Sequence, residues 1–247
     1  MTEYYSIPPQ LYEDQFWWKK DDLEFWKQEL SCEGIKVLEL GCGTGRIANS
    51  LIANSMHYTG LDISSQYVEY ASKKFINTPN ITFIQGDMTD FHLSDTFDYI
   101  FIGFNTFLHL LTIKKAMTCL NSIKSHMDLK SKLIIDIFVP HPLFLHRPDN
   151  LRMHIVDFYN STEKEEQSIY ETLRYNSDTE IANVKWHYKN NKSDTIKFQF
   201  KMKMYYPDTM NRILTDSGYK IIDLWGTYDK DNFDEQSNLQ LYTCQIV

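Results

Sequence analysis

Glu39 and the three glycines that follow it at alternate positions are the residues of this sequence best suited to binding a ligand. They lie in the run VLELGCGTGR, residues 37–46, which begins with the continuous apolar residues of a buried parallel strand. Gly41, Gly43 and Gly45 allow a sharp turn and let the backbone approach a ligand closely. A helix over about 45–53 would point its free N–H groups into that turn. The pattern predicts a nucleotide-type binding loop, with a plain strand-to-helix turn as the alternative.

The spacing of these residues indicates which ligand the loop binds. Dinucleotide-binding loops have two residues between their second and third glycines, whereas this loop has the pattern E-x-G-x-G-x-G. The carboxylate of Glu39 would repel a pyrophosphate and attract an ammonium group. S-adenosylmethionine (SAM) carries an ammonium group and no phosphate. The run ELGCGTGR resembles motif I of the class I SAM-dependent methyltransferases, and the resemblance places Glu39, Cys42 and Arg46 with the glycines in a cofactor site.

The predicted second strand, residues 57–61, ends at Asp62, which lies 21 positions after Gly41. A carboxylate at this strand end can accept two hydrogen bonds from a ribose diol. Asp62 is therefore the predicted ribose ligand, and Ile63 is expected to pack on the adenine. The alternative is that Asp62 caps the following helix, although Ser64 is already placed to do so.

The predicted third strand, residues 81–85, leads into Gly86-Asp87-Met88. This tripeptide resembles the family signature in which the acid meets the adenine amino group and the apolar residue covers the ring. The alternative is an ordinary turn aspartate.

The predicted fourth strand, residues 97–103, opens into FNTFLHLL, which resembles motif IV of the same family. The resemblance implies that the chain passes beside the transferred methyl group at this point. Phe104 is expected to contact the cofactor, and Asn105 and His109 are expected to contact the substrate.

The elements that position these residues alternate between strand and helix. A helix over 113–127 and a strand over 132–139 follow, and later a helix over 207–217, with Gly218 at its carboxyl-terminal cap, precedes strands over 219–226 and 239–247. This order predicts an α/β fold, a Rossmann-like and mostly parallel seven-stranded sheet with helices on both faces, which ends in an antiparallel hairpin. The resemblance covers residues 34–140 and 205–247.

Two segments lie outside this pattern. Residues 10–30 are rich in aromatic residues and are predicted to be helical, docked on the sheet or, as in related methyltransferases, covering the cofactor through Tyr12 and Trp18. Residues 151–204 contain no glycine or proline and break into alternating runs, which predicts a small inserted antiparallel sheet. The expected domains are a core of residues 1–150 and 205–247 and a substrate-side insertion of residues 151–204. Dimerisation through the inserted sheet is the alternative.

Composition limits the class of protein and its partners. With 43 % hydrophobic residues and no apolar run of about 20 residues, we expect a folded protein with no membrane segment. The amino terminus lacks the features of a signal peptide, and the four cysteines show no CxxC spacing, so a cytoplasmic protein with reduced thiols is expected. The net charge of −8 disfavours a nucleic-acid partner. No acid accompanies His141 and His146 at useful spacing, so we expect no metal. A monomer or a homodimer is expected.

Methyl transfer from a sulfonium is an in-line displacement that depends mainly on alignment of the reactants. A general base helps only when the acceptor must lose a proton, and the candidates are His109, His141 and Tyr206. The histidines can instead line the pocket, and Asp136 is expected to face a neighbouring helix end. We predict a methyltransferase of small molecules, with nitrogen preferred over oxygen as the acceptor atom. The alternatives are a tRNA- or protein-directed methyltransferase, a SAM-binding module without catalysis and, more distantly, a nicotinamide-dependent dehydrogenase.

Overall fold

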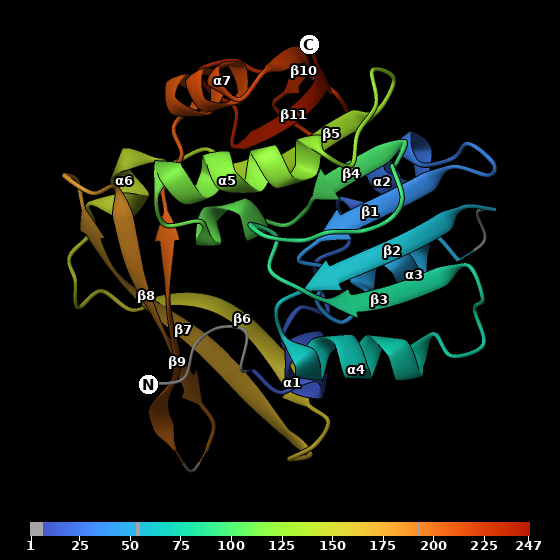
Figure 1. Cartoon of the computed structure of the whole chain (residues 1–247). Coiled ribbons are helices and arrows are strands. Elements are labelled where there is room, and N and C mark those ends of the chain that lie inside the picture. The colour runs from blue at the N-terminus through green and yellow to red at the C-terminus, as the bar shows by residue number, and fades with distance from the viewer. Residues whose placement is uncertain (1–6, 53–54, 192) are drawn as a thin grey trace. The chain divides into compact units, whose positions relative to one another are not determined.

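A computed structural model describes residues 7–52, 55–191 and 193–247, and its contacts divide the chain into two compact units (Figure 1). The core unit comprises Asp21–Val139 and Tyr205–Val247, and the insertion unit comprises Met1–Lys20 and Pro140–Met204. Of the described residues, 7–20 and 140–150 thus group with the insertion unit, although they were predicted to belong to the core. No helix among the described residues is long and apolar enough to cross a membrane.

A seven-stranded sheet forms the centre of the core unit, in the order β10-β11-β5-β4-β1-β2-β3. Its strands are β1 (Lys36–Leu40), β2 (His57–Asp62), β3 (Ile81–Gln85), β4 (Tyr99–Ile102), β5 (Lys132–Phe138), β10 (Tyr219–Trp225) and β11 (Leu239–Ile246). All neighbouring strands are parallel except β11, which is antiparallel to both β5 and β10. The predicted mostly parallel sheet with a closing antiparallel hairpin is confirmed.

Helices cover both faces of this sheet, as predicted (Figure 1). They are α2 (Leu23–Glu29), α3 (Arg46–Ser50), α4 (Ser65–Lys74), the 3-10 helix η2 (Thr106–His109), α5 (Ile113–Lys124) and α7 (Pro207–Asp216). Side chains alternate between the faces of a strand, so Val37 and Glu39 point to the same side. Val37 packs there in a cluster with Trp26 of α2 and Ile47 of α3. Glu39 therefore faces α2 and α3.

The carboxyl-terminal ends of α7 and α3 were both predicted from the sequence. Gly218 follows α7 with a φ of 78°, the left-handed conformation of a carboxyl-terminal cap, as predicted. The helix after the glycine loop is α3, which ends at Ser50, whereas the pattern predicted a helix to about Ala53. Ala53 itself lies outside the described residues.

The prediction of one helix over residues 10–30 was wrong. The segment forms two short helices, α1 (Pro9–Gln15) in the insertion unit and α2 in the core unit. Asp22 immediately precedes α2, and both of its carboxylate oxygens accept hydrogen bonds from Arg46 at 2.7 Å. This contact fixes the start of α2 against the glycine-loop helix, which the amphipathic pattern of the segment does not encode.

The insertion unit contains a four-stranded antiparallel sheet of consecutive hairpins and the short helix α6 (Pro142–Leu145). Its strands are β6 (Met153–Asn160), β7 (Glu165–Asn176), β8 (Ile181–Lys189) and β9 (Asp194–Lys203). Helix α1 packs against β6, and the residues that follow it bond to the same strand: the Trp17 indole N–H donates to the carbonyl of Asp157 at 3.1 Å. Such contacts explain why residues 7–20 belong to this unit.

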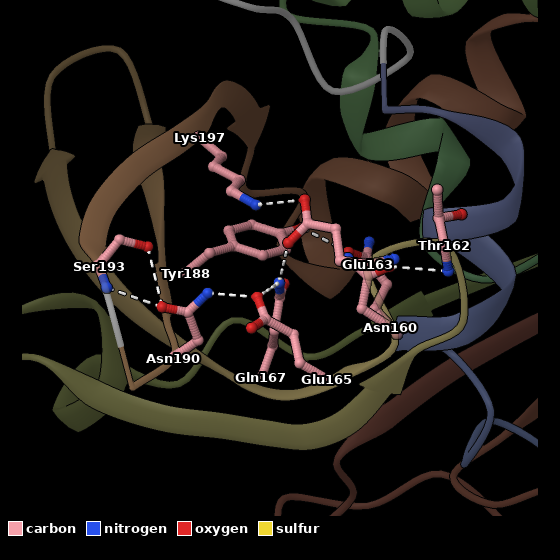
Figure 2. Close-up of polar contacts among 10 residues, drawn as sticks. Asn160, Thr162, Glu163, Glu165, Gln167, Tyr188, Asn190, Ser193 and Lys197 are labelled. Atoms are coloured by element: carbon pink, nitrogen blue, oxygen red, sulfur yellow. Dashed lines mark hydrogen bonds and ion pairs between the residues drawn. The ribbon is translucent and has the colours of Figure 1, made fainter.

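Asparagines replace glycine and proline at the turns of this sheet. The side-chain oxygen of Asn160 accepts the backbone N–H of Glu163 at 2.9 Å, and that of Asn190 accepts the N–H of Ser193 at 2.7 Å (Figure 2). Asn176 receives the N–H of Thr179 in the same way at 2.8 Å. Asparagine side chains that accept hydrogen bonds from the backbone in this manner can stabilise turns that contain no glycine or proline. The inserted sheet predicted from the sequence therefore forms despite its lack of glycine and proline.

Candidate active site

The carboxyl ends of the parallel strands bring the predicted site residues of the core unit together. Glu39 lies at the end of β1, Asp62 ends β2 and Phe104 follows β4. In open sheets of this kind, ligands bind at this edge. The four neighbouring strands β2, β1, β4 and β5 are consecutive in the sheet, so their ends form one continuous edge.

The glycine loop adopts a left-handed conformation at all three glycines, with φ values of 75°, 54° and 78° at Gly41, Gly43 and Gly45. A Cβ on Gly41 would lie 2.2 Å from the Cγ2 atom of Thr106. At Gly41, therefore, the missing side chain makes room for the segment after β4 as well as for the turn. The loop and that segment are packed against each other.

Gly41→Ala is expected to destabilise the protein more than Gly34→Ala. Both glycines have left-handed φ values, 75° and 72°, so both variants lose about 1–2 kcal/mol from the unfavourable backbone conformation. Only Gly41 faces another residue, since a Cβ on Gly34 would meet nothing within 4 Å. We expect a further loss of about 1–3 kcal/mol for Gly41→Ala in urea unfolding, because Thr106 must move. Equal losses of unfolding free energy in the two variants would show that Thr106 can move aside without destabilising the protein.

Glu39 is buried and receives a hydrogen bond from the hydroxyl of Tyr58 on β2. Burial raises the pKa of the Glu39 carboxyl to about 8, and the nearby carboxylates Asp22 and Asp62 act in the same direction. The Tyr58 hydroxyl and the Arg46 guanidinium lower this pKa but do not offset the burial. A buried carboxyl in this condition is stabilised as an anion by any cation that binds beside it.

Asp62 is buried at the tip of β2, and each of its carboxylate oxygens accepts one backbone N–H. Gly43 donates to Oδ2 at 2.8 Å and Ser64 donates to Oδ1 at 2.9 Å. Burial raises the pKa of Asp62, while these two N–H groups oppose the rise. A carboxylate oxygen can accept two hydrogen bonds, so each oxygen can accept one more. Ser64 occupies the N-cap position of α4 without a side-chain cap bond, so Asp62 also organises the start of this helix.

The predicted adenine-side residues lie at or near the surface. Ile63 is 51 % exposed, which is unusual for a large apolar residue beside a buried strand end. Asp87 is exposed, and its Oδ1 atom accepts both the backbone N–H and the hydroxyl of Thr89 at 2.8 Å. Asp87 is thus a turn aspartate, which was the alternative, and a role at the adenine for Asp87 and Met88 stays a prediction.

Phe104 and Asn105 follow β4 with positive φ values of 48° and 65°. The backbone N–H of Phe104 donates to the Oδ2 atom of Asp136 at 3.0 Å, and the Asn105 side-chain oxygen accepts the N–H of Phe138 at 2.8 Å. Asp136 therefore faces the turn that leads into η2, whose N-cap residue is Asn105, so the neighbouring helix end that was expected is the start of η2.

Two predicted cofactor residues have partners within the protein. Arg46 is held by Asp22 in a bidentate ion pair and lies 5.5 Å from the centroid of the Phe104 ring. Cys42 is buried, and a Cβ on Gly60 would lie 2.8 Å from its sulfur, so its side chain packs under the loop. Burial raises the pKa of the Cys42 thiol well above its usual value, which makes the thiol an inert core group.

The candidate general bases are divided between the two units. His109 ends η2 and Tyr206 is the N-cap residue of α7, both in the core unit and both half-buried. His141 belongs to the insertion unit, where its Nδ1 atom accepts the N–H of Leu143 at 3.3 Å and caps α6. Tyr12 and Trp18 also belong to the insertion unit, and both rings contact Phe16. The roles of these five residues stay predictions.

Comparison with known proteins supports the interpretation of this edge. A family model described as a methyltransferase domain matches residues 37–128. The putative methyltransferase YqeM of Bacillus subtilis is 27 % identical over 103 residues, which cover 41 % of this chain and 42 % of YqeM. The dTDP-3-amino-3,4,6-trideoxy-alpha-D-glucopyranose N,N-dimethyltransferase of Streptomyces venezuelae is 25 % identical over 104 residues, 42 % of this chain and 43 % of that protein. The match thus spans about two-fifths of the length of these relatives.

The solved structure of the CcbJ methyltransferase from Streptomyces caelestis aligns with a TM-score of 0.77. The alignment covers 96 % of this chain and 98 % of that chain at 16 % sequence identity. The chain has the class I SAM-dependent methyltransferase fold. The fold predicted from motif I and from the order of the strands is therefore confirmed.

The charged groups beside the glycine loop are complementary to those of SAM. The buried acids Asp62 and Asp22 lie near buried Glu39, as does the guanidinium of Arg46, which is paired with Asp22. SAM carries a positive sulfonium and a positive ammonium, and its ribose supplies two hydroxyl donors. A dinucleotide would instead bring two negative phosphates to the same acids, whose ionised forms are stabilised by a cation.

Four residues that hold the glycine-loop edge and the Phe104–Asn105 turn in place were not recognised as such from the sequence. They are Asp22, Tyr58, Asp136 and Tyr228, whose hydroxyl donates to Asp136 at 3.0 Å. A local signal existed only for Tyr58, a polar-tipped residue within the apolar second strand. The other three are joined to their partners by contacts across long sequence separations.

Proposed function

We propose that this protein transfers the methyl group of SAM to a nitrogen atom of a small-molecule acceptor. The observation that carries this proposal is the pair of buried carboxyl groups beside the left-handed glycine loop. Glu39 is bonded by a neutral tyrosine hydroxyl, and Asp62 is bonded by the loop itself. Both retain the capacity to accept a further donor, as an ammonium and a ribose diol require.

The proposed binding roles follow from this chemistry. Asp62 would accept the two ribose hydroxyls, one on each carboxylate oxygen. Glu39 would balance the ammonium group of the methionine part. Ile63 would cover the adenine ring, because its exposed apolar surface is stabilised when it is removed from water. Met88 and Asp87 would complete the adenine side.

Bound SAM supplies a methyl group that is already activated by its sulfonium. The protein's own residues then have to orient the acceptor and exclude water, an effect of proximity that can account for much of the rate. Asn105 is the proposed wall beside the acceptor, and Phe104 is the proposed contact with the cofactor next to it. His109 is the proposed proton acceptor where the nitrogen must lose a proton, and Tyr206 and His141 are the alternatives.

The preference for nitrogen is supported by the name of one relative, an N,N-dimethyltransferase of an amino sugar nucleotide. Residues 151–204 are proposed to help select the acceptor, and Tyr12 and Trp18 to contact the cofactor. These assignments rest on the order of the motifs along the sequence.

Calorimetry is expected to show that SAM and S-adenosylhomocysteine bind with dissociation constants in the micromolar range, about −8 kcal/mol. NADH should not bind, because its pyrophosphate would meet Glu39 and Asp62. A screen of amines and matched alcohols with methyl-labelled SAM should then transfer label to an amine. Tight binding of NADH without binding of SAM would contradict the proposal, and SAM binding without any transfer would favour a binding module.

A further inference from the structure

Phe104 and Asn105 form a turn that cannot hold its shape unaided. Their φ values of 48° and 65° place two consecutive residues other than glycine in the left-handed region. Such residues persist only where the surroundings fix them, and they concentrate at functional sites. Side chains from other elements must therefore hold this turn.

Asp136 on β5 binds the turn at two successive backbone groups. Its Oδ2 atom accepts the N–H of Phe104 at 3.0 Å, and its carbonyl oxygen accepts the N–H of Asn105 at 3.0 Å. The side chain is 1 % exposed, so this carboxylate acts away from water, where its hydrogen bonds are stronger. One residue therefore fixes the orientation of both peptide groups.

Tyr228, in the segment between β10 and β11, fixes the position of Asp136. Its hydroxyl donates to the same Oδ2 atom at 3.0 Å, and its ring lies 6.0 Å from the ring of Phe25 in α2. Burial raises the pKa of Tyr228, and the charge of Asp136 raises it further. The hydroxyl therefore keeps the proton that it donates in the hydrogen bond. Lys230 in the same segment forms an ion pair with Glu29 of α2.

Phe104 is also held through its ring. The guanidinium of Arg46 lies 5.5 Å from the ring centroid, within the range of a cation–π contact. Asp22 fixes that guanidinium with two bonds of 2.7 Å. Phe104 is thus held through its backbone by Asp136, which Tyr228 bonds, and through its ring by Arg46, which Asp22 bonds.

We propose that Asp136, held by Tyr228, is the positioning residue that sets the geometry of the Phe104–Asn105 turn for methyl transfer. The inference rests on the proposed function, because it needs this turn to line the acceptor. Asp136 acts through the backbone of Phe104 and touches no reacting atom. Tyr228 acts one step further away, through Asp136.

The first test compares Tyr228→Phe with Tyr219→Phe. Tyr219 is a matched control, since it is a buried tyrosine of the same unit whose hydroxyl donates to the carbonyl of Leu120 at 2.8 Å, on helix α5. Each variant loses one hydrogen bond donated by a tyrosine hydroxyl, so falls in melting temperature of similar size are expected. Only Tyr228→Phe should lower kcat, by about tenfold, because a misplaced turn impairs the alignment of the reactants.

Hydrogen exchange measured by mass spectrometry on peptides that cover residues 103–110 gives a readout that needs no acceptor. Tyr228→Phe and Asp136→Asn should speed exchange in this segment at least tenfold, and Tyr219→Phe should leave it unchanged. Equal effects of the two tyrosine variants on kcat, or unchanged exchange in both Asp136→Asn and Tyr228→Phe, would overturn the inference. Faster exchange in a protein that methylates no acceptor would instead show that the proposed function has failed while the positioning contact is real.

Discussion

Asp62→Ala is expected to weaken the binding of S-adenosylhomocysteine at least about a hundredfold, which corresponds to about 3 kcal/mol. In the proposed role of Asp62, the variant loses two charge-assisted hydrogen bonds to the ribose, each contributing about 1.5–3 kcal/mol. It also leaves the N–H groups of Gly43 and Ser64 without their acceptor, so the unfolding free energy should fall by about 1–3 kcal/mol. Calorimetry well below the melting temperature, with circular dichroism on the same sample, separates the two effects.

Asp98→Ala is the matched control for this experiment. The Asp98 carboxylate also accepts a backbone N–H, that of Lys36 at 2.7 Å, but at the opposite end of β1. It should cost stability without changing affinity. If Asp62→Ala lost stability and bound S-adenosylhomocysteine as well as the wild type, Asp62 would be only a structural acceptor, and the ribose assignment would be wrong.

Glu39→Gln is expected to have opposite effects on stability and on cofactor binding. The pKa of Glu39 in the folded protein is about 8, above its ordinary value of 4.5, so the ligand-free protein loses stability as pH rises from about 4.5 to 8. Glutamine cannot ionise, so the unfolding free energy of the variant should not fall in this way. By pH 8 it should have risen relative to that of the wild type by a few kcal/mol. It should bind SAM about 10–100-fold more weakly, because a charge-assisted bond to the ammonium is lost.

Proton release gives a second measurement for Glu39. At pH 7 the free wild-type protein holds Glu39 largely protonated, and the ammonium of SAM favours its ionised form, so binding should release a proton. Calorimetry in two buffers of different ionisation enthalpy detects that proton, and Glu39→Gln should release none. Identical proton release and identical affinity in both proteins would show that Glu39 does not meet the ammonium group.

The sequence by itself determined the order of the elements and the place of the candidate cofactor site. The third strand was predicted at residues 81–85 and is β3 at Ile81–Gln85, because its apolar residues and the polar residues that bound it are local signals. The acids at the ends of β1 and β2 could be placed at one sheet edge from strand order alone, since parallel strands end on the same side. The left-handed glycine loop and the cap at Gly218 followed from residue type.

Only the tertiary structure decided what holds those residues in place. Asp22 meets Arg46 across 24 positions of sequence, and Asp136 meets Tyr228 across 92. The tertiary structure also separated α1 from α2: the two helices come from one aromatic-rich segment of sequence but belong to different units. A local pattern shows that a helix has an apolar face or that a strand carries an acid. It does not show which distant residue donates a hydrogen bond to that acid, because the two meet only when separate parts of the chain come together in the fold.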